Sequence, residues 1–247
     1  MLYRVIINST QKEDTLIHLL SDQEHYLRRV VRLNDGQDFI ALDGKGNSWQ
    51  VKLTPHGGQI INCLHENREL FSRVTLMVAL PKGNGFEDII RCATELGVNS
   101  LQPVITDRTI LKPKENKLER WRKIAMEAAE QSERQIVPYI SPPIPIKKAL
   151  SHFGSVDISK YIAVARTNAS HLLDFLLQDL SAQEIVIATG CEGGWTTEEV
   201  KSAIETGFQE ISLGKRILRA VTAPIMVMAL IAAVDETKHL SENLVNK

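Results

Sequence analysis

The chain has 247 residues, of which 43% are hydrophobic and 24% are charged, values that are ordinary for a globular protein. Its formal net charge is -1, so bulk charge gives no argument for nucleic-acid binding, and any surface for RNA must come from local clusters of cations. No apolar run approaches the ~18–20 residues that cross a bilayer. The three cysteines are far apart and form no CxxC pair, which suggests neither a disulfide framework nor a zinc site. The start of the chain lacks the regions of a signal peptide, so we expect a protein of the reducing cytoplasm.

Residues 1–70 are predicted to form mainly β structure, because short apolar runs alternate with turn residues. The predicted strands span residues 2–7, 37–42, 48–53 and 59–65. The loop at residues 43–47 contains two glycines, which suit the positive φ angles of a hairpin. These 70 residues hold eight Lys/Arg against nine Asp/Glu, so this part of the chain carries no net positive charge.

A helix around residues 22–33 is predicted between the first two strands. One of its faces holds Leu27, Val30, Val31 and Asn34. Another face is cationic, with its residues at i, i+3, i+4 and i+7: His25, Arg28, Arg29 and Arg32. A stripe of this kind is either a solvated helix face or a surface that binds RNA phosphates.

The pattern changes at Arg73, where apolar strands begin to alternate with amphipathic helices. The predicted strands span residues 74–80, 101–105, 161–165, 185–188 and 210–213. The predicted helices span residues 86–96, 118–134, 171–177, 197–206 and 223–234. Short, uniformly apolar strands between helices indicate a parallel sheet that is covered on both faces. We therefore expect an α/β domain over residues 73–247, with residues 137–145, which include four prolines, as an extended loop.

The strongest local signal is a glycine-rich loop at residues 189–196, between an apolar strand and a helix. Thr196 and Glu199 have the spacing of a capping box at the start of that helix. Ligands of open α/β sheets bind beyond the carboxyl ends of the strands, and glycines there allow backbone amides to approach a ligand. Taken alone, the loop is equally compatible with a tight strand-to-helix turn that binds nothing.

A second strand, ending near Leu213, also runs into a glycine, and three cations follow it within five residues: Lys215, Arg216 and Arg219. By themselves these cations also fit a solvated loop. The helix that follows, at residues 224–234, is apolar all round, which indicates burial on all sides. In a domain of this size, a subunit interface could supply one of the burying surfaces.

Two other segments are weaker signals. Residues 80–98 form a Lys-Gly-containing loop and a helix with a glycine end. Residues 110–123 hold six Lys/Arg and two Glu. This charge pattern is typical of a solvent-exposed helix face and is also compatible with a contact to RNA. No GxGxxG follows a strand, and no P-loop, HExxH or GxSxG occurs, so a Rossmann dinucleotide or Rossmann methyltransferase site is unsupported.

In this order, the segments resemble the RsmE family of ribosomal RNA (uridine-N3) methyltransferases, of the SPOUT superfamily, over nearly the whole chain. The family's HHLxxVLR resembles residues 25–32, and its KG and ATELGV resemble residues 82–83 and 93–98. Its ERWRKIAxEAAEQSxR resembles residues 119–134. Its IGPEGGFSxEE resembles residues 189–199, and its SLGxRILRxETA resembles residues 212–223. The last two motifs are the specific ones.

The resemblance implies a PUA-like β-barrel domain for RNA at residues 1–70, followed by a SPOUT domain at residues 73–247 whose C-terminal segment makes a trefoil knot. It implies a homodimer that binds S-adenosylmethionine in the knot and releases S-adenosylhomocysteine. The implied cofactor residues lie on the two glycine-bearing loops: Thr189, Gly190, Cys191, Glu192, Gly193, Gly194, Leu213, Gly214, Ile217, Leu218 and Thr222. Neither a metal nor a membrane is implied.

The implied reaction methylates N3 of a uridine in 16S ribosomal RNA within the small ribosomal subunit. Arg219 and Arg216 are the expected catalytic residues, because negative charge spreads onto O2 and O4 when N3 loses its proton. No residue is predicted to be the general base. The expected RNA contacts are Arg28, Arg29, Arg32 and Lys82.

Two positions depart from the family's pattern. Cys191 stands where the family usually has proline, and Val221 stands where it usually has glutamate. The loss of a carboxylate at Val221 motivates one alternative, a non-catalytic RNA-binding or ribosome-assembly protein that retains the fold. A second alternative, which does not depend on Val221, is a SPOUT enzyme that acts on another RNA, such as tRNA.

Overall fold

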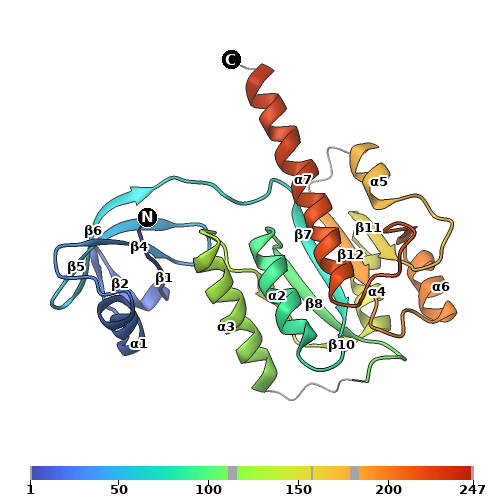
Figure 1. The fold of residues 1–247 in the computed structure, drawn as a ribbon, viewed down its shortest axis with the longest axis horizontal. Helices are drawn as coiled ribbons and strands as arrows, with labels where there is room; N and C mark the ends of the chain where they lie inside the picture. Colours follow the sequence, from blue (N-terminus) through green and yellow to red (C-terminus); the bar gives the residue numbers. More distant parts are fainter. Residues whose placement is uncertain (1, 111–115, 157, 179–183, 246–247) are drawn as a thin grey trace. The chain divides into compact units, whose positions relative to one another are not determined.

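The computed structural model describes residues 2–110, 116–156, 158–178 and 184–245, and the chain divides into two compact units (Figure 1). The first unit comprises Met1–Glu69 and Met126–Val137, and the second comprises Leu70–Ala125 and Pro138–Lys247. The division falls inside helix α3 (Asn116–Gln131), so the last turns of this helix belong to the first unit.

The first unit is built on a six-stranded sheet with the order β1-β4-β5-β6-β3-β2. Its strands are β1 (Arg4–Ile6), β2 (Lys12–Glu13), β3 (Leu16–Ile17), β4 (Asp38–Leu42), β5 (Ser48–Thr54) and β6 (Gly57–Leu64). Strands β1 and β4 are parallel, whereas the other pairs are antiparallel. The short strands β2 and β3 were not predicted, because two residues are too few to show an alternating pattern. The close approach of β3 requires Gly57, where a Cβ would lie 2.4 Å from the Ile17 carbonyl oxygen.

The helix predicted at residues 22–33 is shorter, and it changes its pitch. It begins as α1 (Ser21–His25) and continues as a π-helical turn, η2 (Tyr26–Val30), in which the Val31 amide donates to the Tyr26 carbonyl oxygen at 3.0 Å. Leu27 is fully buried, as its place on the apolar face predicts, but Val30 is 60% exposed. Val30 shares a face with Leu27 only if the helix keeps an α period, and the π turn, which holds more residues than an α turn, rotates Val30 away from Leu27.

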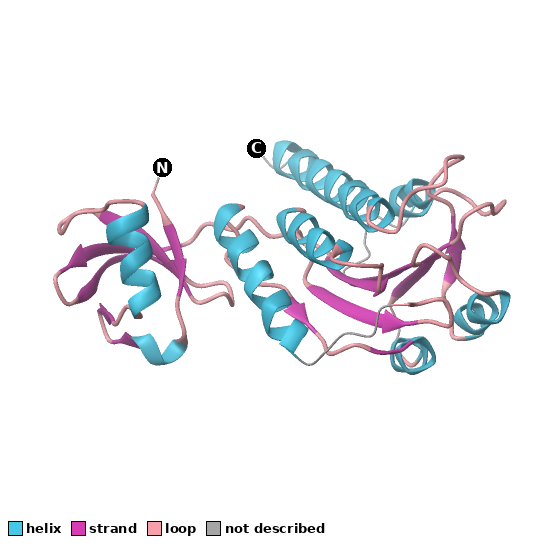
Figure 2. Cartoon of the chain, turned by 60° about the horizontal axis from the view of Figure 1, so that its bottom comes forward, coloured by secondary structure: helices cyan, strands magenta, loops and turns pink. Residues whose placement is uncertain are grey.

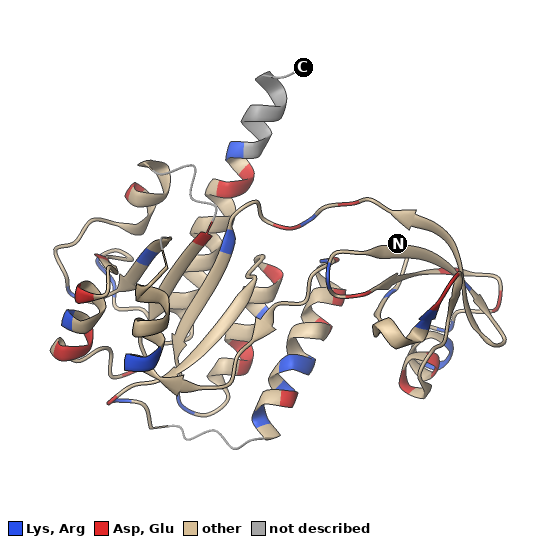
Figure 3. Cartoon of the chain, turned by 180° about the vertical axis from the view of Figure 1, so that it is seen from behind, with Lys and Arg blue, Asp and Glu red and all other residues tan. Residues whose placement is uncertain are grey.

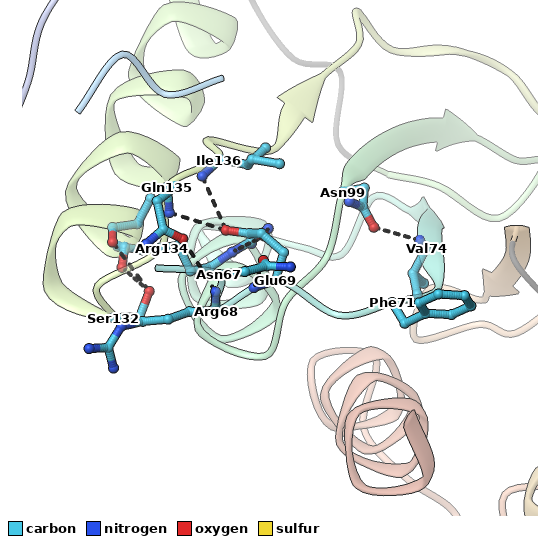
Figure 4. A network of polar contacts seen from close by, with 12 residues as sticks. Asn67, Arg68, Glu69, Phe71, Val74, Asn99, Ser132, Arg134, Gln135 and Ile136 are labelled. Carbon is cyan, nitrogen blue, oxygen red and sulfur yellow. Dashed lines mark hydrogen bonds and ion pairs between the residues drawn. The ribbon is translucent and has the colours of Figure 1, made fainter. Parts of the chain in front are cut away.

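A partly buried carboxylate, Glu69, holds the end of the first unit's N-terminal segment by contacts within that unit (Figure 4). Glu69 accepts hydrogen bonds from Arg134 Nε at 3.0 Å and from the backbone amides of Gln135 and Ile136, both at 3.1 Å. Arg134 is 2% exposed, so this ion pair is desolvated and depends on the added backbone donors for its stability.

The second unit is an α/β layer structure on a seven-stranded parallel sheet with the order β10-β8-β7-β12-β11-β13, to which β9 pairs at β8. Its strands are β7 (Arg73–Ala79), β8 (Ser100–Ile105), β9 (Tyr139–Ile140), β10 (Ile144–Pro145), β11 (Ser159–Ala163), β12 (Glu184–Thr189) and β13 (Gln209–Ile211). The prediction of an α/β class with a parallel sheet is confirmed.

Helices cover both faces of this sheet, with α2 and α7 on one side and α4 and α6 on the other (Figure 2). The helices of the second unit are α2 (Gly85–Glu95), α4 (Ile146–Gly154), α5 (Leu172–Gln178), α6 (Thr197–Glu205) and α7 (Thr222–Val245). Helix α4 was not predicted, and α7 continues beyond the predicted end at residue 234. Within the described part of the chain, no helix is both long and apolar enough to cross a membrane.

The half-buried Glu130 on α3 makes the stability of the first unit depend on pH. Its Oε1 accepts a hydrogen bond from the Ile6 amide at 2.6 Å, but burial dominates and raises the pKa of Glu130 to about 7. Because the pKa in the folded state lies above the ordinary value of 4.5, the fold favours the protonated form. The contribution of Glu130 to the free energy of unfolding is therefore fully present below its ordinary pKa of 4.5, and it is lost as the pH rises through about 7.

We predict that Glu130→Gln increases the free energy of unfolding at pH 8 by on the order of 2 kcal/mol, after allowance for partial exposure, and has little effect at pH 5. Glutamine keeps an acceptor for the Ile6 amide but carries no charge to desolvate. Urea denaturation at both pH values measures the difference, with Glu119→Gln, on the exposed side of the same helix, as the control. An equal effect at pH 5 and pH 8 would contradict the assignment.

Candidate functional site

The candidate site lies where three neighbouring parallel strands end. Strand β11 pairs with β12 on one side and with β13 on the other, all in the same direction. The carboxyl ends of parallel strands meet at one edge of a sheet, so the loops that follow these strands converge there. Two of these loops are the glycine-bearing segments singled out in the sequence, and the third, at residues 164–171, follows β11.

The three loops surround a cavity of about 870 Å³. Other parts of its wall come from Arg108, which follows β8, and from the start of α7. The lining residues are Arg108, Ala163, Val164, Ala165, Arg166, Gly190, Cys191, Glu192, Gly193, Gly194, Trp195, Leu213, Gly214, Arg216, Ile217, Leu218, Arg219, Ala220, Val221 and Ala223. The wall therefore combines backbone-rich loops, aliphatic side chains and several arginines.

The loop after β12 is a tight turn held at its far end by a helix cap. The Gly194 amide donates to the Cys191 carbonyl oxygen at 2.9 Å, and Gly194 has a φ of +67°, which glycine adopts without strain. The predicted capping box is confirmed, since the Thr196 amide donates to Glu199 Oε2 at 2.8 Å and the Glu199 amide donates to Thr196 Oγ1 at 3.2 Å. Helix α6 thus begins directly after the cavity wall.

A second element fixes the same loop from the side of β8. Arg108 Nη1 donates to the carbonyl oxygens of Gly193 at 2.6 Å and Trp195 at 3.0 Å. The neighbouring Asp107 amide donates to Glu199 Oε1 at 2.9 Å, so the buried Glu199 carboxylate serves both the helix cap and this contact. Sequence reasoning did not single out Arg108, although its position just after a strand of the same sheet was a usable signal.

The loop after β13 carries the second group of predicted residues. Gly214 has a φ of +99°, and its amide donates to Ser212 Oγ at 3.1 Å. Beyond it, the exposed side chains of Arg216 and Arg219 both line the cavity, as do the aliphatic Ile217 and Leu218. The two expected catalytic arginines and the expected cofactor loop are therefore brought together.

Two predicted cofactor residues do not line the cavity. Thr189 is the last residue of β12, is fully buried, and has a hydroxyl without a hydrogen-bond partner among the described residues. Thr222 is the first residue of α7, and its amide donates to the Arg219 carbonyl oxygen at 2.9 Å. Thr189 therefore lies beneath the loop after β12, whereas Thr222 is exposed at the start of α7.

The two positions that depart from the family's pattern have different surroundings. Cys191 is buried, with its Sγ 3.8 Å from Thr106 Oγ1. Val221 lines the cavity and packs closely on Gly85, where a Cβ would lie 2.8 Å from Val221 Cγ2. The remaining carboxylate in the wall, Glu192, accepts a hydrogen bond from the Lys82 amide at 3.0 Å, which brings the loop of Lys82 next to the cavity.

Figure 3 marks the Lys and Arg positions of the chain in blue. The cationic stripe predicted in the first unit is only partly available to a ligand, because one of its arginines is engaged within the unit. Arg28 forms an ion pair with Asp35 at 2.8 Å and donates to the Thr54 carbonyl oxygen at 2.6 Å. Arg29 and Arg32 are exposed, and neither forms an ion pair with any residue that the structure describes. Arg29 and Arg32 are therefore more available to RNA phosphates than Arg28 is.

The cationic segment at residues 110–123 is divided in the same way. Lys112 and Lys114 lie outside the described residues. Lys117 and Arg120 pair with Glu87 at 3.3 Å and 2.7 Å, so this part of the segment serves the packing of α3 against α2. Across the described ranges, no group of three or more His, Cys, Asp or Glu side chains is arranged to hold a metal ion.

Comparison with known proteins identifies the class of this architecture. Residues 68–232 match the family model of an RNA methyltransferase domain, and residues 21–60 match that of an RNA methyltransferase PUA domain. The fold class is thereby confirmed as a SPOUT-type α/β domain that follows a PUA-like β domain.

The similarity extends over nearly the full length of this chain and most of the length of its curated relatives. The chain is 46% identical over 240 residues to the ribosomal RNA small subunit methyltransferase E of Synechocystis, covering 96% of this chain and 79% of that protein. It is 30% identical to the Bacillus subtilis protein of the same name, over 93% and 95% of the two chains. A Neisseria gonorrhoeae structure of this name, bound to S-adenosylmethionine, is 29% identical with a TM-score of 0.83 and covers 95% and 98%. This chain belongs to the ribosomal RNA small subunit methyltransferase E family.

Proposed function

We propose that this protein methylates N3 of a specific uridine in 16S ribosomal RNA of the small subunit, with S-adenosylmethionine as the methyl donor. The observation that carries the proposal is the cavity between the two loops whose sequences match the family's specific motifs. The names of the Synechocystis and Bacillus subtilis relatives support small-subunit ribosomal RNA as the substrate, and the ligand of the Neisseria structure supports the donor.

The residues around the cavity fit a nucleoside cofactor. A volume of about 870 Å³ lies within the roughly 300–1,000 Å³ of small-molecule sites. The loop at residues 190–194 lines the cavity with three glycines and so adds little side-chain bulk, while Leu213, Ile217 and Leu218 offer apolar surface to an adenine ring. When bound, S-adenosylmethionine supplies a methyl group on a positively charged sulfur and leaves as S-adenosylhomocysteine.

Methyl transfer to N3 sets the site three tasks toward the uridine: alignment with the methyl group, removal of the N3 proton, to which no residue is assigned, and stabilisation of the negative charge that the loss of this proton leaves. The base is buried in pairing within a helix, so the site must accept it unpaired or flipped out and hold it in line with the methyl group. Such alignment can lower a barrier by roughly 7–11 kcal/mol. Arg219 and Arg216 stabilise the negative charge that develops on O2 and O4, because fixed cations beside a developing charge need no reorganisation.

RNA is held by both domains in this proposal. The PUA-like domain, residues 1–70, contributes Arg29 and Arg32, with Arg28 weakened as a contact by its ion pair to Asp35. The methyltransferase domain, residues 73–247, contributes Lys82 next to the cavity. The protein would act in the cytoplasm, where small subunits are assembled.

We also propose a homodimer that uses α7. One side of this helix packs inside the second unit, where its residues Val227, Met228 and Ile231 are buried. Another stripe of apolar residues remains partly exposed: Ile225, Met226, Ala229, Leu230 and Ala233. A continuous apolar stripe of this kind is a liability for a monomer and suits a second copy of the same helix.

The proposed activity is tested by mass spectrometry of nucleosides from 16S ribosomal RNA. A strain that lacks this protein should lose 3-methyluridine, and the wild-type chain should restore it. We predict that Arg219→Ala restores less than a tenth as much, because one charge-stabilising donor contributes about 10²–10³ in rate. Unchanged 3-methyluridine in the deletion strain would refute the function, and full restoration by Arg219→Ala would refute the role of the arginine.

We predict that Gly190→Leu abolishes binding of S-adenosylhomocysteine in calorimetry, whereas Gly190→Ala retains it. A Cβ at Gly190 would meet its nearest neighbours at 3.4 Å, which is ordinary contact, so alanine fits. The larger leucine has no room in the loop without occupying the space of the ligand. Circular dichroism serves as the folding control, and tight binding by a folded Gly190→Leu protein would place the ligand elsewhere.

We predict that Ala229→Arg converts a dimer into a monomer or prevents folding. Wild-type protein should sediment at twice the 27.7 kDa chain mass at micromolar concentration, because the exposed stripe of α7 is covered in the dimer. Analytical ultracentrifugation measures the change, and Ser151→Arg, at an exposed position of α4, is the matched control. A wild-type chain that sediments only as a monomer would count against the dimer.

A further inference from the structure

The loop after β11, at residues 164–171, lies between the two proposed cofactor loops and has no part in the function proposed so far. Strand β11 is paired with β12 and β13, so this loop leaves the sheet between the loops that follow those strands. Its residue Arg166 is exposed and lines the cavity. A cation at this point faces whatever enters the site from solvent.

Hydrogen bonds fix this loop to both of its neighbours. Trp195 Nε1, from the loop after β12, donates to the Ala163 carbonyl oxygen at 2.9 Å. The Val164 amide donates to the Ile211 carbonyl oxygen at 3.0 Å, which ties the start of the loop to β13. The Leu172 amide donates to the Ser212 carbonyl oxygen at 3.0 Å and holds its end. Arg166 is therefore carried on a short segment anchored on both sides.

The backbone of Arg166 has a left-handed conformation, with a φ of +58°. Side chains with a Cβ adopt this region at a cost, and glycine or asparagine would occupy the turn more easily. A residue held in an unfavourable conformation at the edge of a cavity points to use of its side chain by a ligand, when other observations agree.

The charge of the cavity wall agrees with an anionic ligand beyond the cofactor. Four arginines line the cavity, Arg108, Arg166, Arg216 and Arg219, against one carboxylate, Glu192. S-adenosylmethionine carries a sulfonium, an ammonium and a carboxylate, so its net charge is positive and leaves the excess of arginines uncompensated. Arg108 is occupied with loop carbonyls, whereas Arg166 forms no ion pair or hydrogen bond with the residues described. The excess positive charge suits a polyanion such as RNA.

We propose that Arg166 binds a backbone phosphate of the RNA beside the target nucleotide. This inference rests on the proposed function and adds a substrate contact to it. The planar guanidinium at the outer edge of the cavity can take two phosphate oxygens at once, while the base itself enters between the cofactor loops. Arg166 thereby positions the flipped nucleotide, and Arg216 and Arg219 act on the charge of the base.

The test compares Arg166→Asn, Arg166→Lys and the wild type. Asparagine tolerates the left-handed turn and removes the charge, lysine keeps a single charge, and Lys201→Gln, at an exposed position of α6, is the matched control. Small ribosomal subunits from a strain without this protein are the RNA probe, with their affinity measured between 50 and 200 mM salt. Calorimetry with S-adenosylhomocysteine measures the cofactor site independently.

We expect Arg166→Asn to weaken subunit binding by about tenfold at low salt and to flatten the slope of log affinity against log salt by about 0.7, the value for one phosphate contact on a single strand. Affinity for S-adenosylhomocysteine and thermal stability should stay within twofold and about 2 °C of the wild type. Arg166→Lys should recover most of the slope, and Lys201→Gln should change nothing.

Two results would overturn the inference. A fall in S-adenosylhomocysteine affinity with an unchanged salt slope would assign the guanidinium to the cofactor's carboxylate. Unchanged binding of both ligands would make Arg166 a solvated side chain. In either case, methylation of the same subunits by the wild type would keep the proposed function intact. Conversely, a wild type that binds subunits with the expected slope but transfers no methyl group would refute the function and leave the phosphate contact standing.

Discussion

The parallel pairing of β12, β11 and β13 is the constraint on which the candidate site depends. If β11 ran in the opposite direction, its following loop would emerge at the other edge of the sheet, and the cavity would lose its middle wall. The strands are held together by apolar burial, since Ile162, Ile187 and Ile211 are almost inaccessible to solvent. The hydrophobic core thus places three loops that are far apart in the sequence, and the loops need only local contacts to keep their shape.

Those local contacts offset the freedom that glycine brings to the site. Gly190, Gly193 and Gly194 keep side chains away from the backbone, but they also increase the conformational entropy that folding must overcome. The buried Glu199 carboxylate accepts from the amides of Thr196 and Asp107 and so joins the helix cap to the loop after β8. A buried carboxylate with fewer donors would destabilise the fold, which explains why one residue here serves two segments.

The sequence predicts this architecture well where periodicity is long and poorly where contacts are long-range. Five of the seven parallel strands of the second unit were found to within a few residues, because uniformly apolar runs between helices have few other interpretations. The other two, β9 and β10, have two residues each and lie in the segment at residues 137–145 that was predicted as an extended loop. Helix α4 was missed because the prolines before it dominated the pattern, and the π turn at Tyr26–Val30 was missed because an α period fits those residues equally well. The sequence pattern cannot predict a trefoil knot, because connections that thread through loops are very rare. Only the family resemblance implies one.

The residues of the site divide in the same way. Gly190, Gly214 and the arginines of the loop after β13 could be found because they lie beside strand ends in one short segment each. Arg108 and Arg166 also follow strands, but neither stands in a glycine-bearing segment, and the features that tie them to the site, a hydrogen bond to a distant loop and a left-handed turn, leave no local pattern. The two kinds of cation also explain how a chain of net charge -1 could select RNA. Single guanidiniums at separated, rigid points bind weakly to a flexible strand, but their contributions add on an RNA already folded to match them.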